Sequence, residues 1–145
     1  MVPENEIKTS ASEIQKHIDA YFDAVRLFAS LASELKNKGK ADFSPLTAVL
    51  QRIITLIKED ERILVGIANS PYSFMERKTG IDEDGAKVII YGVNVAIYAV
   101  NISVSIGVPD DHLLYVAMAS ICNHLGLAGN GAFDITETTE LEKIS

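Results

Sequence analysis

Apolar residues recur at steps of three and four along most of this chain, the spacing of one face of an α-helix. In the first such stretch, about residues 11–38, they alternate by four and three over three heptads: Ile14, Ile18, Tyr21, Val25, Phe28, Ala32 and Leu35. Ser10 and Glu13 form a capping-box pattern at its start, and Gly39 follows its end. The pattern predicts a polar arm at residues 1–9 and a long helix whose seam could pair with a second chain.

A second apolar stretch starts at Ser44-Pro45, which suits a helix N-cap followed by the first helical position. It continues to Asn69-Ser70-Pro71, where we expect the helix to end. The charged run 58–62 interrupts it, as either a solvated turn of helix or a short break. Residues 71–81 are predicted to form a loop or a partly helical connector.

Residues 88–106 carry no formal charge, and three interpretations compete for them. Strands are disfavoured because strict alternation is absent, and the length approaches that of a membrane span. Polar side chains recur at Tyr91, Asn94, Tyr98, Asn101 and Ser105, which places them on one stripe of a helix. We therefore prefer a buried helix of a soluble protein with one polar stripe.

The remaining breaks complete the predicted fold. Residues 107–111 (Gly-Val-Pro-Asp-Asp) end one helix and start the next, and Gly126 offers a stop for it. A second capping-box pattern at Asp134–Glu137 predicts a last helix. The expected fold is all-α: an irregular bundle of about five helices, in one domain at residues 10–145.

Net charge, cysteine content and the N-terminal residues limit the classes of function that this chain can have. The chain has 145 residues and a net charge of −7, which disfavours binding to nucleic acid and to anionic membranes. Its single cysteine, Cys122, excludes an internal disulfide framework and the usual cysteine-based zinc sites. The N-terminus lacks the basic-then-apolar order of a signal peptide, so we expect a cytoplasmic protein.

Motifs for nucleotide binding, serine hydrolysis and zinc proteolysis are absent. His17 is predicted to lie on the surface, and Cys122 to be a buried structural thiol. The sequence Asp110-Asp111-His112 contains metal-ligating types, but three consecutive residues at a helix start point in different directions. We therefore interpret its acids as complementing the helix dipole, and we expect no metal and no cofactor.

Three segments together resemble the first half of an HD domain, closest to the HD-GYP branch: Tyr91-Gly92-Val93-Asn94-Val95-Ala96, Ile106–Asp111 and Ala117–Gly126. That family carries His-Ser-Val-Asn-Val-Ala, then a break after a glycine, then Leu-Leu-His-Asp-Ile-Gly. Asn123 follows Tyr91 by 32 positions, as the family's His-Asp pair follows its first His. The resemblance covers about residues 60–127, with the HD-like helix pair at about 82–127.

The resemblance implies that the family's metal ligands are replaced. Its first His falls on Tyr91, and its His-Asp pair falls on Asn123 and His124. Phosphohydrolysis in this family uses metal-activated water, and a phenol, a carboxamide and one imidazole are poor substitutes as ligands. We therefore expect a chain without enzymatic activity: a degenerate regulatory or protein-interaction module, in bacterial signalling by resemblance, and a homodimer.

The residues of the old site could persist as a pocket for a small ligand or partner, or as a hydrogen-bonded core network. The candidates for this site are Tyr91, Asn94, Tyr98, Asn101, Asn123 and His124. Two rival functions stay open. One is a divergent metal-dependent phosphohydrolase whose remaining ligands lie in a missing C-terminal half. The other is a nucleotide sensor that does not hydrolyse its ligand.

Overall fold

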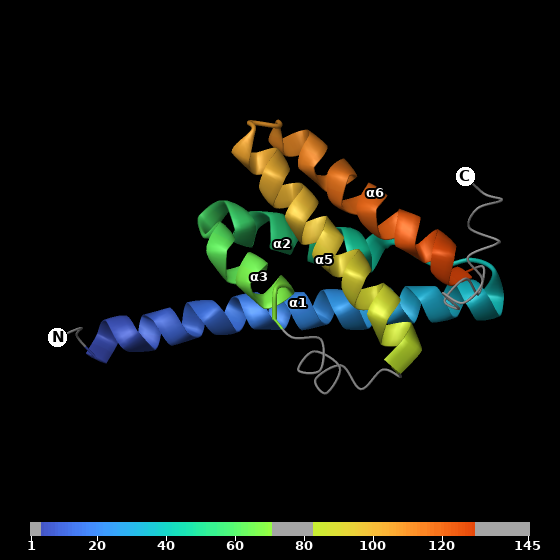
Figure 1. Cartoon of the computed structure of the whole chain (residues 1–145), viewed down its shortest axis with the longest axis horizontal. Coiled ribbons are helices and arrows are strands. Elements are labelled where there is room, and N and C mark those ends of the chain that lie inside the picture. Colours follow the sequence, from blue (N-terminus) through green and yellow to red (C-terminus); the bar gives the residue numbers. More distant parts are fainter. Residues whose placement is uncertain (1–3, 71–82, 130–145) are drawn as a thin grey trace.

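The computed structural model describes residues 4–70 and 83–129, with side chains at 11–70 and 87–125. The described residues form five α-helices and no strand, which confirms the all-α prediction. The helices are α1 (Glu4–Lys38), α2 (Ser44–Glu59), α3 (Glu61–Ala68), α5 (Glu83–Ser105) and α6 (Asp110–Gly129). In Figure 1, α1 runs the length of the molecule, and α5 and α6 form an antiparallel hairpin that crosses it.

Helix α1 differs from its prediction at the start. It begins at Glu4, so the backbone is already helical at Ser10 and the predicted capping box there is wrong. Most of the expected polar arm at residues 1–9 belongs to the helix. The end was predicted correctly: the helix stops at Lys38, and Gly39 follows with a left-handed φ of 71°. Its amide donates to Leu35 O at 3.0 Å and so caps the last turn.

The seam of α1 packs inside this chain. Tyr21, Val25 and Phe28 are each 0% exposed, because α2, α3, α5 and α6 all contact this helix. The prediction that the seam offers a surface for a second chain is therefore wrong for its central part. A heptad pattern identifies a helix face that seeks a partner, and here the partners are helices of the same chain.

The second apolar stretch forms two helices with a break at Asp60, which was one of the two structures expected for the charged run. The Asp60 amide donates to Leu56 O at 2.9 Å, and its carboxylate accepts from the Arg62 amide at 3.1 Å. One residue thus caps the end of α2 and the start of α3. At the other end of α2, Phe43 rather than Ser44 is the N-cap residue.

Helix α5 spans the uncharged stretch, as predicted, and the turn at Gly107 (φ 83°) folds α6 back along it. Helix α6 continues through Gly126 to Gly129, so the predicted stop at Gly126 is wrong. By length and composition Lys87–Ser105 could cross a membrane, with a mean hydropathy of 1.7, but 44% of that window is buried inside the protein. The predicted connector at 71–81 and the last helix from Asp134 lie outside the described residues.

Candidate functional site

The hairpin of α5 and α6 carries the positions that the sequence singled out. A Cβ added to Gly92 on α5 would stand 3.1 Å from His124 Cβ on α6. The two helices therefore touch at this height, and Tyr91 lies level with Asn123 and His124 along the hairpin. The arrangement follows from the short turn at residues 106–109, since an antiparallel hairpin pairs positions equally far from its turn.

Asn94 joins α5 to two other helices, α1 and α3. Its Oδ1 accepts from the Tyr21 hydroxyl at 2.7 Å, and its Nδ2 donates to Ala68 O at 3.2 Å. Ala68 is the last residue of α3, and the carbonyls of a final helical turn have no partner within their own helix. Asn94 thus supplies a donor to the end of α3 and an acceptor to a buried phenol of α1.

Tyr98 extends the same network by one helical turn. Its hydroxyl donates to Asn69 Oδ1, immediately after α3. Burial raises the pKa of the Tyr21 phenol far above its ordinary value, and Tyr98 nearby raises it further. Tyr21 therefore stays a neutral hydrogen-bond donor throughout the physiological pH range. The polar stripe of α5 acts here as a set of ties between α1, α3 and α5.

The other four candidates do not join this network. Tyr91 is 58% exposed and Asn123 is exposed. His124 Nδ1 lies 2.9 Å from Ser120 O, one turn earlier on its own helix. Asn101 has a buried Oδ1 that finds no hydrogen-bond partner in the described part of the chain. The structure therefore brings together Asn94 and Tyr98 but links neither to Asn123 or His124.

Two side chains lie where the sequence did not place them. His17 is 1% exposed, with Nδ1 2.7 Å from Glu13 O and Nε2 without a partner among the described residues, so the predicted surface position is wrong. Cys122 is exposed rather than buried. His17 stands four residues before Tyr21 on α1, so its place on the buried seam could have been read from the spacing.

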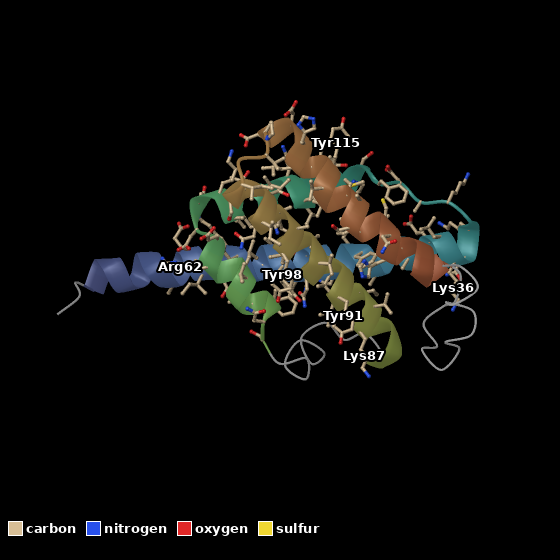
Figure 2. The ribbon with its side chains drawn as sticks, turned by 45° about the horizontal axis from the view of Figure 1, so that its top comes forward. Lys36, Arg62, Lys87, Tyr91, Tyr98 and Tyr115 are labelled. Atoms are coloured by element: carbon tan, nitrogen blue, oxygen red, sulfur yellow. The ribbon has the colours of Figure 1, made fainter. Side chains whose placement is uncertain are left out.

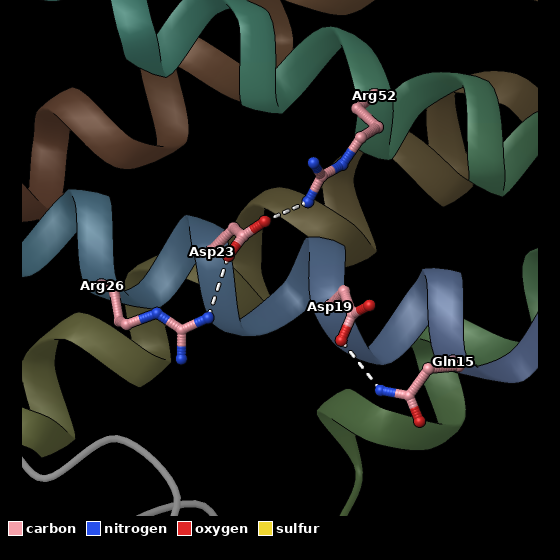
Figure 3. A network of polar contacts seen from close by, with 5 residues as sticks. All are labelled: Gln15, Asp19, Asp23, Arg26 and Arg52. Carbon is pink, nitrogen blue, oxygen red and sulfur yellow. Dashed lines mark hydrogen bonds and ion pairs between the residues drawn. The ribbon is translucent and has the colours of Figure 1, made fainter.

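Charged residues form a separate network on the faces of α1 and α2. Asp23 accepts from Arg26 at 2.9 Å and from Arg52 at 2.6 Å, and one turn earlier Gln15 donates to Asp19 at 2.8 Å (Figure 3). The hydrogen bond from Arg52 lowers the pKa of Asp23 below its ordinary value, and the bond from Arg26 adds to the shift. The Asp23–Arg52 pair joins α1 to α2 at the protein surface, and the other two pairs lie within α1.

Two open hollows flank α1. One, of about 230 Å³, is lined by Lys16, Asp19, Arg52 and Leu56, and the other, of about 490 Å³, by Glu13, Ile14, Asp60, Arg62 and Ile63. Neither includes a residue of the predicted pocket.

Nowhere in the described residues do three His, Cys, Asp or Glu side chains gather as they would for a metal ion. Asp110 pairs with Lys58 of α2, whereas Asp111 pairs with its neighbour His112, so the first of these three residues points away from the other two.

Comparison with known proteins adds no relative. No protein-family model matches this chain, and neither a curated protein nor a solved structure matches it at a significant level.

Proposed function

We propose that this chain is a non-catalytic HD-type module used for regulation or protein interaction, acting in the cytoplasm in bacterial signalling. One observation carries the proposal. Tyr91, Asn123 and His124, to which the resemblance assigns the family's first metal ligands, lie at one height of the α5–α6 hairpin.

The chemistry of these three side chains argues against metal-dependent hydrolysis. A neutral amide and a phenol bind divalent transition metals poorly compared with imidazole and carboxylate. His124 offers only Nε2, because its Nδ1 already lies against the Ser120 carbonyl. A single imidazole nitrogen cannot fix the geometry that activates a water molecule.

The polar stripe supports the same view. The side chains of Asn94 and Tyr98 already form hydrogen bonds with residues of α1 and of the end of α3. Asn94 and Tyr98 could bind a ligand only if the contacts that hold α3 were broken. A network used in this way stabilises a scaffold. The module would then act through its surface.

The test measures metal content and hydrolysis together. The purified chain should contain no stoichiometric Fe, Mn or Zn, and it should not hydrolyse bis(p-nitrophenyl) phosphate or cyclic dinucleotides with added Mn²⁺. Bound metal, or hydrolysis that is abolished by Asn123→Ala or His124→Ala, would overturn the proposal and favour a divergent phosphohydrolase.

A restoration experiment tests the alignment itself. The triple variant Tyr91→His, Asn123→His, His124→Asp should gain Mn²⁺ binding, measured by calorimetry, because it returns the family's ligands to one height of the hairpin. The matched control Ile102→His, Asn123→His, His124→Asp places the same three ligand types with one of them about 16 Å farther along α5. Equal binding by both variants would refute the assignment of these positions.

A further inference from the structure

The outer side of α5 bears a row of apolar side chains in solvent, which we name the α5 stripe: Tyr91, Val95, Ile102 and Ile106. They are 58%, 41%, 60% and 74% exposed. The described part of the chain has six exposed large hydrophobic residues: three of them lie on α5, and a fourth, Ile106, directly follows its last residue, Ser105. Contiguous exposed apolar surface on a protein marks a contact site more often than single exposed residues do.

The four residues share one face, because the last turn of α5 continues as far as the Ile106 amide, which donates to Ile102 O at 3.1 Å. At 3.6 residues per turn they fall within about 60° of one another. Val93, Ile97 and Val100 are buried on the opposite side. No charged residue lies between Val88 and Ile106, so nothing on this face protects it from association. In Figure 2, Lys87, Tyr91 and Tyr98 follow one another along α5, and Tyr115 lies apart on α6.

The spacing of the four stripe residues is symmetric about the middle of the stripe. Tyr91 and Ile106 are equally far from the midpoint between Tyr98 and Ala99, and so are Val95 and Ile102. If two copies of α5 pack antiparallel across a twofold axis at this midpoint, Tyr91 meets Ile106 of the other copy and Val95 meets its Ile102. A twofold interface requires this reciprocity, in which residue i contacts j and j contacts i.

Charge limits where two copies of this chain can approach each other. Two copies of a chain with a net charge of −7 repel elsewhere, so an uncharged face is where they can approach.

We propose that the α5 stripe is the contact surface for a second copy of this chain, paired antiparallel about Tyr98. This assignment rests on the proposed function, because it names the partner of an interaction module. It also assigns the interface of the expected homodimer to α5 instead of the seam of α1, which is buried.

Sedimentation velocity tests the interface. The wild-type chain should sediment at twice its mass of 15.8 kDa. The double variant Tyr91→Glu, Ile106→Glu sets acid against acid and should sediment as a monomer, while Tyr91→Lys, Ile106→Glu sets opposite charges together and should keep the dimer. Tyr115→Glu is the matched control, since Tyr115 is 72% exposed but lies outside the stripe, and it should stay dimeric. Circular dichroism should show the same helix content in all four proteins.

Disulfide cross-linking tests the orientation in a Cys122→Ser background. Val95→Cys together with Ile102→Cys should form a covalent dimer on oxidation, because each cysteine meets the other type across the axis. Val95→Cys alone should not, because in the antiparallel pair the two copies of that residue are about 10 Å apart along the axis. Efficient cross-linking of the single variant would overturn the antiparallel arrangement.

Three other outcomes would contradict the assignment of the α5 stripe to a second copy. A wild-type chain that stays monomeric at every concentration has no such interface. A dimer that survives Tyr91→Glu, Ile106→Glu uses another surface. Flotation of the monomer with vesicles of phosphatidylcholine and phosphatidylglycerol, lost in that variant, would make the stripe a membrane contact. Hydrolytic activity would end the proposed function without changing the mass, so the two failures are distinguishable.

Discussion

The contact at Gly92 yields the sharpest stability prediction, for Gly92→Ala. A Cβ at this position would stand 2.4 Å from Cε1 and 3.0 Å from Cζ of Phe28, and 3.1 Å from His124 Cβ. Carbon atoms prefer separations of about 3.5–4.0 Å, so the ring must move by roughly 1 Å. Phe28 is 0% exposed and sits in the packed core, so it cannot turn into solvent.

Two opposing contributions set the magnitude. Replacing a glycine inside a helix by alanine gains about 1 kcal/mol of helix propensity. Overpacking a close-packed core by one carbon costs about 1–3 kcal/mol, and the 2.4 Å contact puts this case at the upper end. We therefore expect Gly92→Ala to lower the free energy of unfolding by about 1–2 kcal/mol.

The control is Gly66→Ala, which makes the same chemical change inside helix α3. A Cβ there meets nothing within 4 Å, so only the propensity gain of about 0.5–1 kcal/mol remains. Urea unfolding followed by circular dichroism should separate the two variants by about 1.5–3 kcal/mol, with Gly66→Ala the more stable. If Gly92→Ala stabilised the protein as much as Gly66→Ala does, the packing of Phe28 against α5 would be refuted.

Three further predictions concern polar contacts, and urea unfolding checks each of them. Asn94→Ala should lower the free energy of unfolding by about 2–4 kcal/mol, because it leaves both the Tyr21 hydroxyl and a helix-end carbonyl unpaired. Tyr21→Phe should lower it by about 1 kcal/mol. Equal losses in the two variants would contradict the double role of Asn94. Asp23→Asn should cost less than about 1 kcal/mol at neutral pH, since the pair with Arg52 is exposed. The pKa of Asp23 is lowered in the folded state, so this difference is present above the ordinary carboxylate pKa and should vanish as the pH falls through the folded value; a difference that persists in acid would show another cause. His17→Leu should leave stability unchanged or raise it, because it removes a buried nitrogen that has no partner among the described residues. A large loss would mean that this nitrogen is bonded.

Local signals located most helix boundaries, ends and starts alike, but they failed at Ser10 and at Gly126. Gly39, Asn69 and Gly107 each mark an end that the structure contains, because the backbone groups of a final turn need a local solution. The start of α1 at Glu4 was missed, because the capping pattern at Ser10 lies inside a longer helix. Capping residues and glycines both tolerate an interior helical position, as Ser10 and Gly126 do here, so neither signal alone fixes a boundary.

The candidate site, too, could be predicted only in part. Spacing alone placed Tyr91, Asn94, Tyr98 and Asn101 on one stripe of a helix, and the turn at Gly107 set α5 beside α6. The spacing did not reveal that Asn94 faces α1 and α3, where it forms hydrogen bonds with the Tyr21 hydroxyl and the Ala68 carbonyl.

By itself, the sequence determined the helices, most of their ends and the faces that seek burial, because these depend on contacts within a few residues. Only the tertiary structure decided which partner covers each face. It buried the seam of α1, enclosed His17 and left the α5 stripe in solvent. The physical reason is that burial depends on the positions of helices distant in sequence, and the same apolar spacing suits a core, a second copy or a membrane equally well.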